Sequence, residues 1–132
     1  MAIKSQVDFA IDTVGEITGN RYPGAFTVKT ALSMRDTLKQ DEIYRSIVGP
    51  DPANASANSK GIASAIAYLA THVVVSPEWW KKLQGGLECD DLNLIADINN
   101  KAQEVIEVEY KKLAQEAQKA EDILKAVAAP TS

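Results

Sequence analysis

The last third of the chain constrains the fold most, because it predicts one helix from about Asp91 to Val127. Apolar residues recur there with alternating spacings of four and three, which draws a single narrow stripe along a helix of 3.6 residues per turn. This stripe is termed the seam, and its members are Ile106, Tyr110, Leu113, Ala117, Ala120, Leu124 and Val127.

The length of this helix predicts that part of it projects from the body. At about 1.5 Å per residue the helix would run roughly 55 Å. A compact chain of 132 residues has a diameter of only roughly 36 Å. A projecting seam needs another surface to pack on, and a second chain is the simplest source. The alternative is that the seam folds back on the hairpin and first helix of its own domain.

Composition predicts one ordinary soluble domain. The chain is 45% hydrophobic and 24% charged, as in typical globular proteins. We expect a single domain over residues 1–127 and a short polar tail over 128–132. The only cysteine, Cys89, favours a reducing compartment. No apolar run is long enough for a signal peptide or a membrane span, so we expect an intracellular protein with no membrane partner.

The formal net charge of -4 argues against a nucleic-acid partner, because such proteins need basic surfaces to displace counterions from phosphates. A local basic patch would have to use Lys81 and Lys82, or Lys111 and Lys112. Solvation of helix surfaces explains these lysines more simply.

The segment from Gly15 to Lys29 predicts a β-hairpin. Gly19, Asn20, Pro23 and Gly24 are typical turn residues between two short strands. Phe26 and Val28 would share one face of the second strand. Residues 1–14 are compatible with either strand or helix, since Val7, Ile11 and Val14 also have helical spacing.

Helices are predicted for most of the remaining chain. Ser33 is a helix cap, supported by Asp36 three residues later, and Gly49 ends that helix. The apolar side of this first helix would be Met34, Leu38, Ile43, Tyr44 and Ile47. Residues 49–59 resemble a loop. Residues 61–75 are apolar nearly all round, which predicts a central helix.

A short helix should restart at Ser76-Pro77-Glu78, and Asp90 or Asp91 should cap the long helix. The expected fold class is therefore α+β, mainly α. An N-terminal β-hairpin would pack on a helical core, with one long C-terminal helix over about residues 91–127.

No catalytic, cofactor or metal site is predicted. His72 is the sole histidine and has no nucleophile at a suitable spacing, so we interpret it as a core histidine. Cys89 is interpreted as an inert thiol. Zinc requires more cysteine and histidine ligands than this chain has, and Glu88, Asp90 and Asp91 match no calcium loop.

Trp79 and Trp80 are the most distinctive side chains. Adjacent helical residues point about 100° apart, so one tryptophan can be buried while the other anchors an interface. The alternative is that both pack inside the domain. The predicted protein-binding residues are Trp79, Trp80, Ile106, Tyr110, Leu113, Ala117, Leu124 and Val127.

The order of short motifs between about Gly15 and Tyr110 resembles that of bacteriophage tail assembly chaperones and the small structural proteins encoded near them. The motifs are Phe26-Thr27-Val28-Lys29, Leu32-Ser33, Asp41-Glu42-Ile43-Tyr44-Arg45 before Gly49, Ala67-Tyr68-Leu69, Ser76-Pro77-Glu78-Trp79-Trp80, Gly86-Leu87 and Asp91. The resemblance implies a binding role, since such chaperones keep the tape-measure protein soluble and recruit tail-tube subunits. It also implies action in the cytoplasm of the bacterial host or in the virion.

The long C-terminal helix departs from a transient chaperone and suits a virion subunit that clamps neighbouring copies, so both roles stay open. We therefore expect a non-enzymatic phage assembly or virion protein, forming a homo-oligomer or part of a larger assembly with tail or virion proteins. One alternative is a self-contained adaptor or regulatory module. A less favoured one is a small enzyme whose pocket joins His72, Cys89 and carboxylates.

Overall fold

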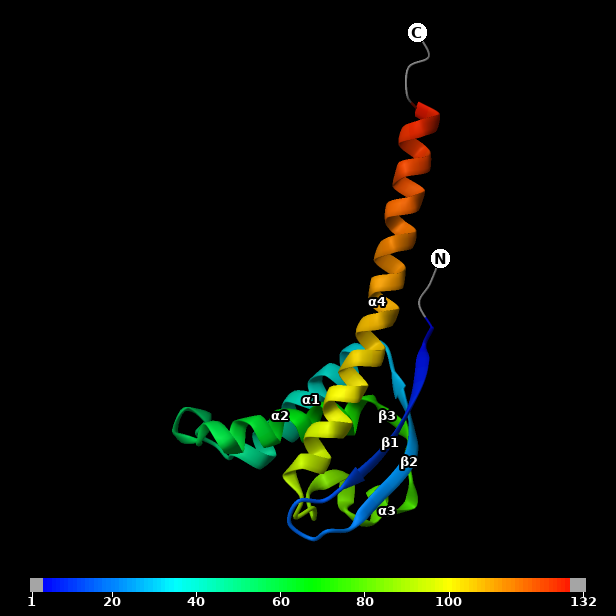
Figure 1. Ribbon diagram of the computed structural model, residues 1–132. Helices are drawn as coiled ribbons and strands as arrows, with labels where there is room; N and C mark the ends of the chain where they lie inside the picture. The colour runs from blue at the N-terminus through cyan, green and yellow to red at the C-terminus, as the bar shows by residue number, and fades with distance from the viewer. Residues whose placement is uncertain (1–3, 129–132) are drawn as a thin grey trace.

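The computed structural model describes residues 4–128 and has an α+β, mainly helical fold, which confirms the predicted fold class (Figure 1). The elements in chain order are β1 (Gln6–Val14), β2 (Arg21–Lys29), α1 (Met34–Val48), the 3-10 turn η1 (Pro52–Asn54), α2 (Ala57–His72), β3 (Val73–Val75), α3 (Glu78–Lys82), the 3-10 turn η2 (Gln84–Gly86) and α4 (Leu92–Ala128). No helix among these residues is both long and apolar enough to cross a bilayer.

The predicted hairpin is present, but its first strand precedes the predicted one. β1 pairs antiparallel with β2 from Gln6 opposite Lys29 to Val14 opposite Arg21, and residues 15–20 form the loop. Pro23 and Gly24 were wrongly assigned to the turn and lie within β2. Proline is tolerated there because β3 pairs with β2 only near Thr27, which leaves β2 with one neighbour at Pro23.

The third strand was missed, because residues 61–75 were predicted as one helix. The helix α2 instead begins at Ala57, capped by the Ser56 hydroxyl, and ends at His72. The three valines that follow are β-branched and fit a strand better than a helix. They pair with β2 and complete a sheet of order β1-β2-β3.

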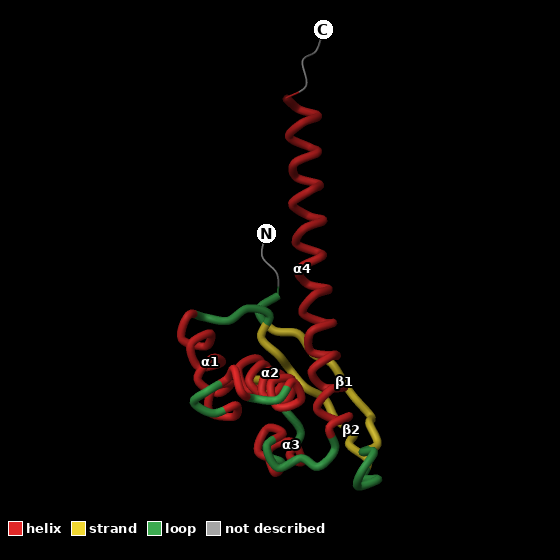
Figure 2. Tube along the Cα trace, turned by 90° about the vertical axis from the view of Figure 1, so that its left-hand side faces the viewer, coloured by secondary structure: helices red, strands yellow, loops and turns green. Residues whose placement is uncertain are grey.

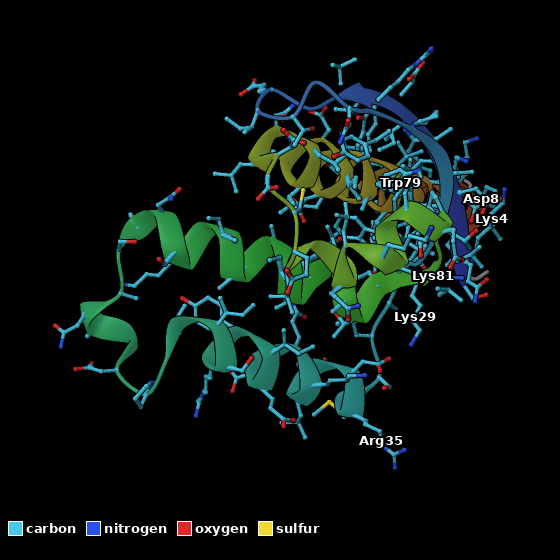
Figure 3. The ribbon with its side chains drawn as sticks, turned by 90° about the horizontal axis from the view of Figure 1, so that it is seen from below. Lys4, Asp8, Lys29, Arg35, Trp79 and Lys81 are labelled. Atoms are coloured by element: carbon cyan, nitrogen blue, oxygen red, sulfur yellow. The ribbon has the colours of Figure 1, made fainter. Side chains whose placement is uncertain are left out.

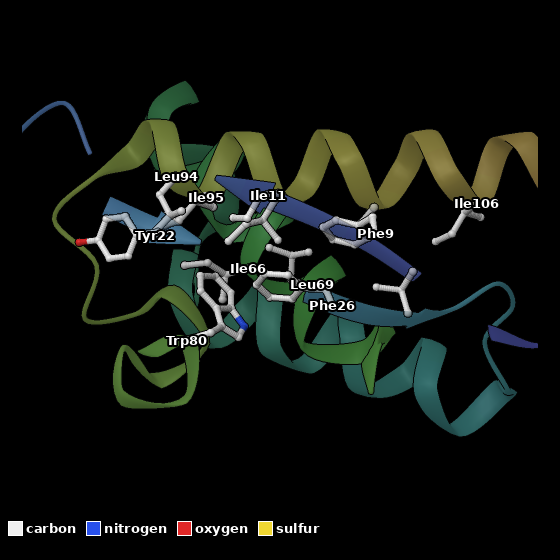
Figure 4. Close-up of a cluster of buried hydrophobic side chains, with 13 residues drawn as sticks. Phe9, Ile11, Tyr22, Phe26, Ile66, Leu69, Trp80, Leu94, Ile95 and Ile106 are labelled. Carbon is white, nitrogen blue, oxygen red and sulfur yellow. The ribbon is translucent and has the colours of Figure 1, made fainter. Parts of the chain in front are cut away.

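The core lies between one face of the sheet and the helices, which are all on the same side of it (Figure 2). Phe26 and Val28 share the inward face of β2, as predicted, and both are buried. The buried cluster comprises Phe9, Ile11, Tyr22, Phe26, Val28, Ile66, Leu69, Trp80, Leu94, Ile95, Ile98, Ala102 and Ile106 (Figure 4). The N-terminal part of α4 is therefore part of the core.

The helix α1 has its predicted ends, and it lies on the outside of the body. Ser33 accepts a hydrogen bond from the Asp36 backbone, and Gly49 ends the helix with a φ of 90°. None of its residues is buried, and Met34 and Leu38 are largely exposed. The reason is that α1 packs on the outside of α2 and so lies away from the sheet.

The boundaries of α4 agree closely with the prediction. It begins at Leu92 and ends at Ala128, so Ala128 belongs to the helix and not to the tail. The rest of the predicted tail, 129–132, lies outside the described residues.

Candidate protein-interaction surface

The base of α4 is held by a buried carboxylate. Asp91 is 0% exposed. Its Oδ1 accepts hydrogen bonds from the backbone N–H groups of Ile17 at 2.7 Å and Thr18 at 3.0 Å. Its Oδ2 accepts from the Thr18 hydroxyl at 2.7 Å and the Tyr22 hydroxyl at 3.1 Å. Four donors from the hairpin therefore converge on one side chain at the start of the rod.

This arrangement corrects the role predicted for Asp91. Its side chain binds the hairpin loop, and only its backbone carbonyl serves the helix, accepting from the Leu94 N–H at 3.0 Å. The hydrogen bond from the Thr18 hydroxyl, followed by those from the Thr18 and Ile17 backbones, lowers the pKa of Asp91. The group is thus held as a carboxylate.

Gly15 provides the space that Asp91 occupies. A Cβ atom on Gly15 would lie 2.2 Å from Asp91 Oδ2, which is far inside van der Waals contact. Glycine is therefore required here for close approach.

The next turns of α4 extend this attachment. The Asn93 side chain accepts from the Glu16 N–H at 3.0 Å and donates to the Val14 carbonyl at 2.9 Å. The Thr13 hydroxyl donates to Asp97 at 3.1 Å. Contacts from two successive turns fix the direction of α4 relative to the sheet.

The body stops covering α4 near Tyr110. Ile106 is 7% exposed and Glu109 is also buried. Tyr110 is 45% exposed, and its hydroxyl donates to the Thr30 carbonyl at 2.9 Å. No residue between 111 and 127 is buried. The helix beyond Tyr110 projects into solvent as a rod of roughly 27 Å (Figure 1).

The projecting rod carries the exposed half of the seam. Leu113 is partly covered, whereas Leu124 is 68% and Val127 79% exposed. Ala117 and Ala120 are also exposed. The exposed side chain of Ile123, beside Leu124, adds to this surface and was not among the predicted contact residues, although it lies at the edge of the seam.

Ion pairs along the helix reinforce the rod. Lys111 lies 3.2 Å from Glu107, Lys112 3.8 Å from Glu109, and Lys125 3.5 Å from Glu121. Each exposed pair of this kind contributes about 0.2–0.5 kcal/mol. Lysines 111 and 112 thus serve the surface of their own helix.

The tryptophans attach α3 to the sheet. Trp80 is buried, with its ring 6.0 Å from that of Phe26. Trp79, which is labelled in Figure 3, packs against Tyr22 and donates its Nε1–H to the Pro23 carbonyl at 2.8 Å. Its side chain is half-buried. Binding of a partner by these two residues stays a prediction. Trp80 and Ile106 are both buried, so they do not belong to the exposed surface.

The two candidate catalytic residues, His72 and Cys89, each form a hydrogen bond with a nearby backbone carbonyl. His72 is buried, stacks on Tyr68 and has its Nδ1 2.7 Å from the Tyr68 carbonyl. Burial lowers the pKa of His72. The Cys89 thiol donates to the Asp91 carbonyl at 3.3 Å, and burial raises its pKa.

Within residues 4–128, no three side chains of His, Cys, Asp or Glu are grouped closely enough to hold a metal ion. The geometry thus singles out the rod, from Tyr110 to Val127, as the candidate site. Comparisons of the chain with protein-family models, with curated proteins and with solved structures give no match.

Proposed function

We propose that this chain is a non-enzymatic bacteriophage protein of the tail module that acts through protein–protein contacts, either in assembly or as a virion subunit. The observation that carries the proposal is the rod, an exposed apolar seam on a helix whose base is fixed to a folded body. The resemblance of the motifs to tail assembly chaperones supplies the biological setting.

The exposed seam suits an assembly contact of modest strength. Fully burying one aliphatic side chain contributes about 1.5–3 kcal/mol. Leu113, Ile123, Leu124 and Val127 would therefore contribute at most roughly 6–12 kcal/mol per rod, since Leu113 is already partly covered. Association costs about 4–15 kcal/mol in lost freedom. A single rod would bind weakly, and repetition in an assembly would strengthen the contact.

The polar attachment of α4 supports a role as a permanent subunit. A helix whose base is held by Asp91, Asn93 and Asp97 keeps one direction relative to its body, as a repeating structure requires. A chaperone that releases its clients can also use an exposed seam. Both roles belong to the proposal.

An adaptor or regulatory module is the second candidate. Met34 and Leu38 on α1 favour it, because they form an exposed apolar pair away from the rod. In that case a partner would bind the body, and the rod would be dispensable.

The test is genetic. The gene would be deleted from the phage genome that carries it, and variants would be supplied in trans. We expect heads without tails in the deletion, rescue by the wild type, and failure of rescue by Leu124→Glu. Gln115→Glu is the matched control, because it adds the same charge to an exposed position of the rod outside the seam. Electron microscopy of the lysates supplies the readout.

Two outcomes would contradict the proposal. Normal tails in the deletion would exclude a role in the tail. Full rescue by Leu124→Glu would exclude the seam and favour the adaptor. Genes for a tail tube and a tape measure beside this gene are also expected.

A further inference from the structure

We propose that the projecting half of α4 pairs with the same segment of a second copy in antiparallel orientation. This inference rests on the proposed use of the rod as a contact surface and goes beyond it by naming the occupant. Three properties of the rod lead to it: the symmetry of its apolar residues, its length and its charges.

The residues of the seam within the rod have spacings that are the same in both directions. Their spacings from Tyr110 to Val127 are three, four, three, four and three. The sequence of the seam is Tyr110, Leu113, Ala117, Ala120, Leu124 and Val127, with large residues at both ends and alanines in the middle. Such a pattern is self-complementary about a point midway between residues 118 and 119.

A two-fold axis at that point brings residues of matching size together. It places Leu113 beside the partner's Leu124, Tyr110 beside the partner's Val127, and Ala117 beside the partner's Ala120. The alanines allow the helix axes to approach closely, since interaxial distance depends on the side chains at the contact. The interface is isologous, as in most two-fold dimers.

The length of the rod fits this arrangement. The same axis places Ala128, the last described residue of α4, beside the partner's Glu109. Glu109 is the last residue of α4 that is buried against its own body. Each rod therefore covers the free length of the other and ends where the partner's body begins.

The charges select the antiparallel direction. In a parallel, in-register pair, Glu116 would face the partner's Glu121 on both sides of the seam, and such like charges are destabilising. In the antiparallel pair, Glu116 instead lies beside the partner's Ile123. It lies on the opposite side of the seam from the partner's Glu121, so the antiparallel pair removes this repulsion. Glu121 lies beside the partner's Ala114.

The direction is tested with single cysteines in a Cys89→Ser background, which keeps a hydrogen-bond donor at that position. Leu113→Cys and Leu124→Cys are prepared as separate full-length proteins with different tags, mixed and mildly oxidised. A disulfide requires Cα atoms within about 7 Å. In the antiparallel pair the two different positions meet, whereas identical positions are about 16 Å apart along the axis.

We expect cross-linked dimer in the mixture and none from either variant alone. Leu113→Cys mixed with Gln115→Cys is the control and should not cross-link, because Gln115 lies away from the seam. Light scattering of the wild type should give twice the mass of the 14.3 kDa chain.

Three results would overturn the inference. They are a monomeric wild type, cross-linking of each variant with itself, and a dimer in which the mixture does not cross-link. A monomer that is still required for tails would remove the pair and leave the proposed function standing. If the antiparallel pair is confirmed but the phage builds normal tails without the gene, the pair stands and the proposed function in the tail is wrong.

Discussion

At the scale of single residues, the attachment of the rod depends on Asp91 and on the absence of a side chain at Gly15. Four hydrogen bonds reach Asp91 from residues more than sixty positions earlier in the chain. The sequence offered only a helix-start signal at Asp91, because local patterns carry no information on which loop lies opposite. The attachment was therefore outside the reach of sequence reasoning.

A methyl group at Gly15 tests the packing at this point. Gly15→Ala should destabilise the protein by about 1–3 kcal/mol, the usual cost of overpacking, because its Cβ would meet Asp91 at 2.2 Å. Gly61→Ala is the control, since nothing lies within 4 Å of its Cβ position in α2. It should instead stabilise by about 0.5–1 kcal/mol. Urea unfolding measures the stability of both variants. Equal changes in the two would show that the close contact between Gly15 and Asp91 does not limit stability.

The lowered pKa of Asp91 predicts that the free energy of unfolding depends on pH. Its folded pKa is below its ordinary value of 3.8, chiefly through the Thr18 hydroxyl. A lowered folded pKa adds stability that is fully present above 3.8 and is lost as the pH falls through the folded pKa. The difference in unfolding free energy between wild type and Asp91→Asn should thus shrink in acid. A difference that stays constant from neutral pH into that range would show that the charge is unimportant.

At the scale of elements, α4 combines two parts with different surroundings. Its first half completes the core through Leu94, Ile98 and Ala102, whereas no residue from 111 to 127 is buried by the described chain. The same regular helix therefore acts as a core element and as a projecting rod.

A charge in the exposed half should separate folding from association. Leu124→Glu should change the unfolding free energy by less than about 0.5 kcal/mol, because exposed positions tolerate substitution, yet it should abolish self-association. Leu113→Glu should also abolish association but destabilise slightly, since Leu113 is partly covered. Circular dichroism and light scattering measure the two effects. Wild-type association of both variants would count against the seam.

Element prediction from the sequence succeeded where the signal was local and long. The seam spacing located α4 to within one residue at each end, and the Ser33 cap and Gly49 bounded α1. Prediction failed where pairing with a distant strand decides whether a segment is a strand or a helix. β1 was obscured by residues that also have helical spacing, and Val73–Val75 became a strand because β2 offered a free edge. The exposure of Met34 and Leu38 on α1 could not be predicted, because the pattern of this helix does not reveal that α2 separates it from the sheet.

At the scale of the whole molecule, an antiparallel pair would be a strut with a body at each end. The two-fold axis between residues 118 and 119 would place the starts of the two α4 helices about 80 Å apart along the rods. A parallel pair would bring both bodies to one end. The relative direction of the two rods therefore determines the shape of the dimer.

Small-angle X-ray scattering distinguishes these shapes. We expect the distance distribution of the wild-type dimer to show a second maximum at about 55 Å, because each body packs along α4 from Leu92 to Glu109 and is centred near residue 100. Leu124→Glu should lose this maximum, whereas Gln115→Glu should retain it. A dimer with one maximum would indicate bodies that lie side by side.

The charges beside the seam give the sharpest test of direction. Glu116→Lys should change the affinity of the antiparallel pair by less than about twofold, because position 116 lies beside the partner's Ile123. In a parallel pair the same change would face the partner's Glu121 and strengthen association. Glu121→Lys should likewise leave the antiparallel pair nearly unchanged, because position 121 lies beside the partner's Ala114, whereas it would strengthen a parallel pair. Sedimentation equilibrium at low salt measures these affinities, and raised salt should reduce the differences because it screens exposed charges.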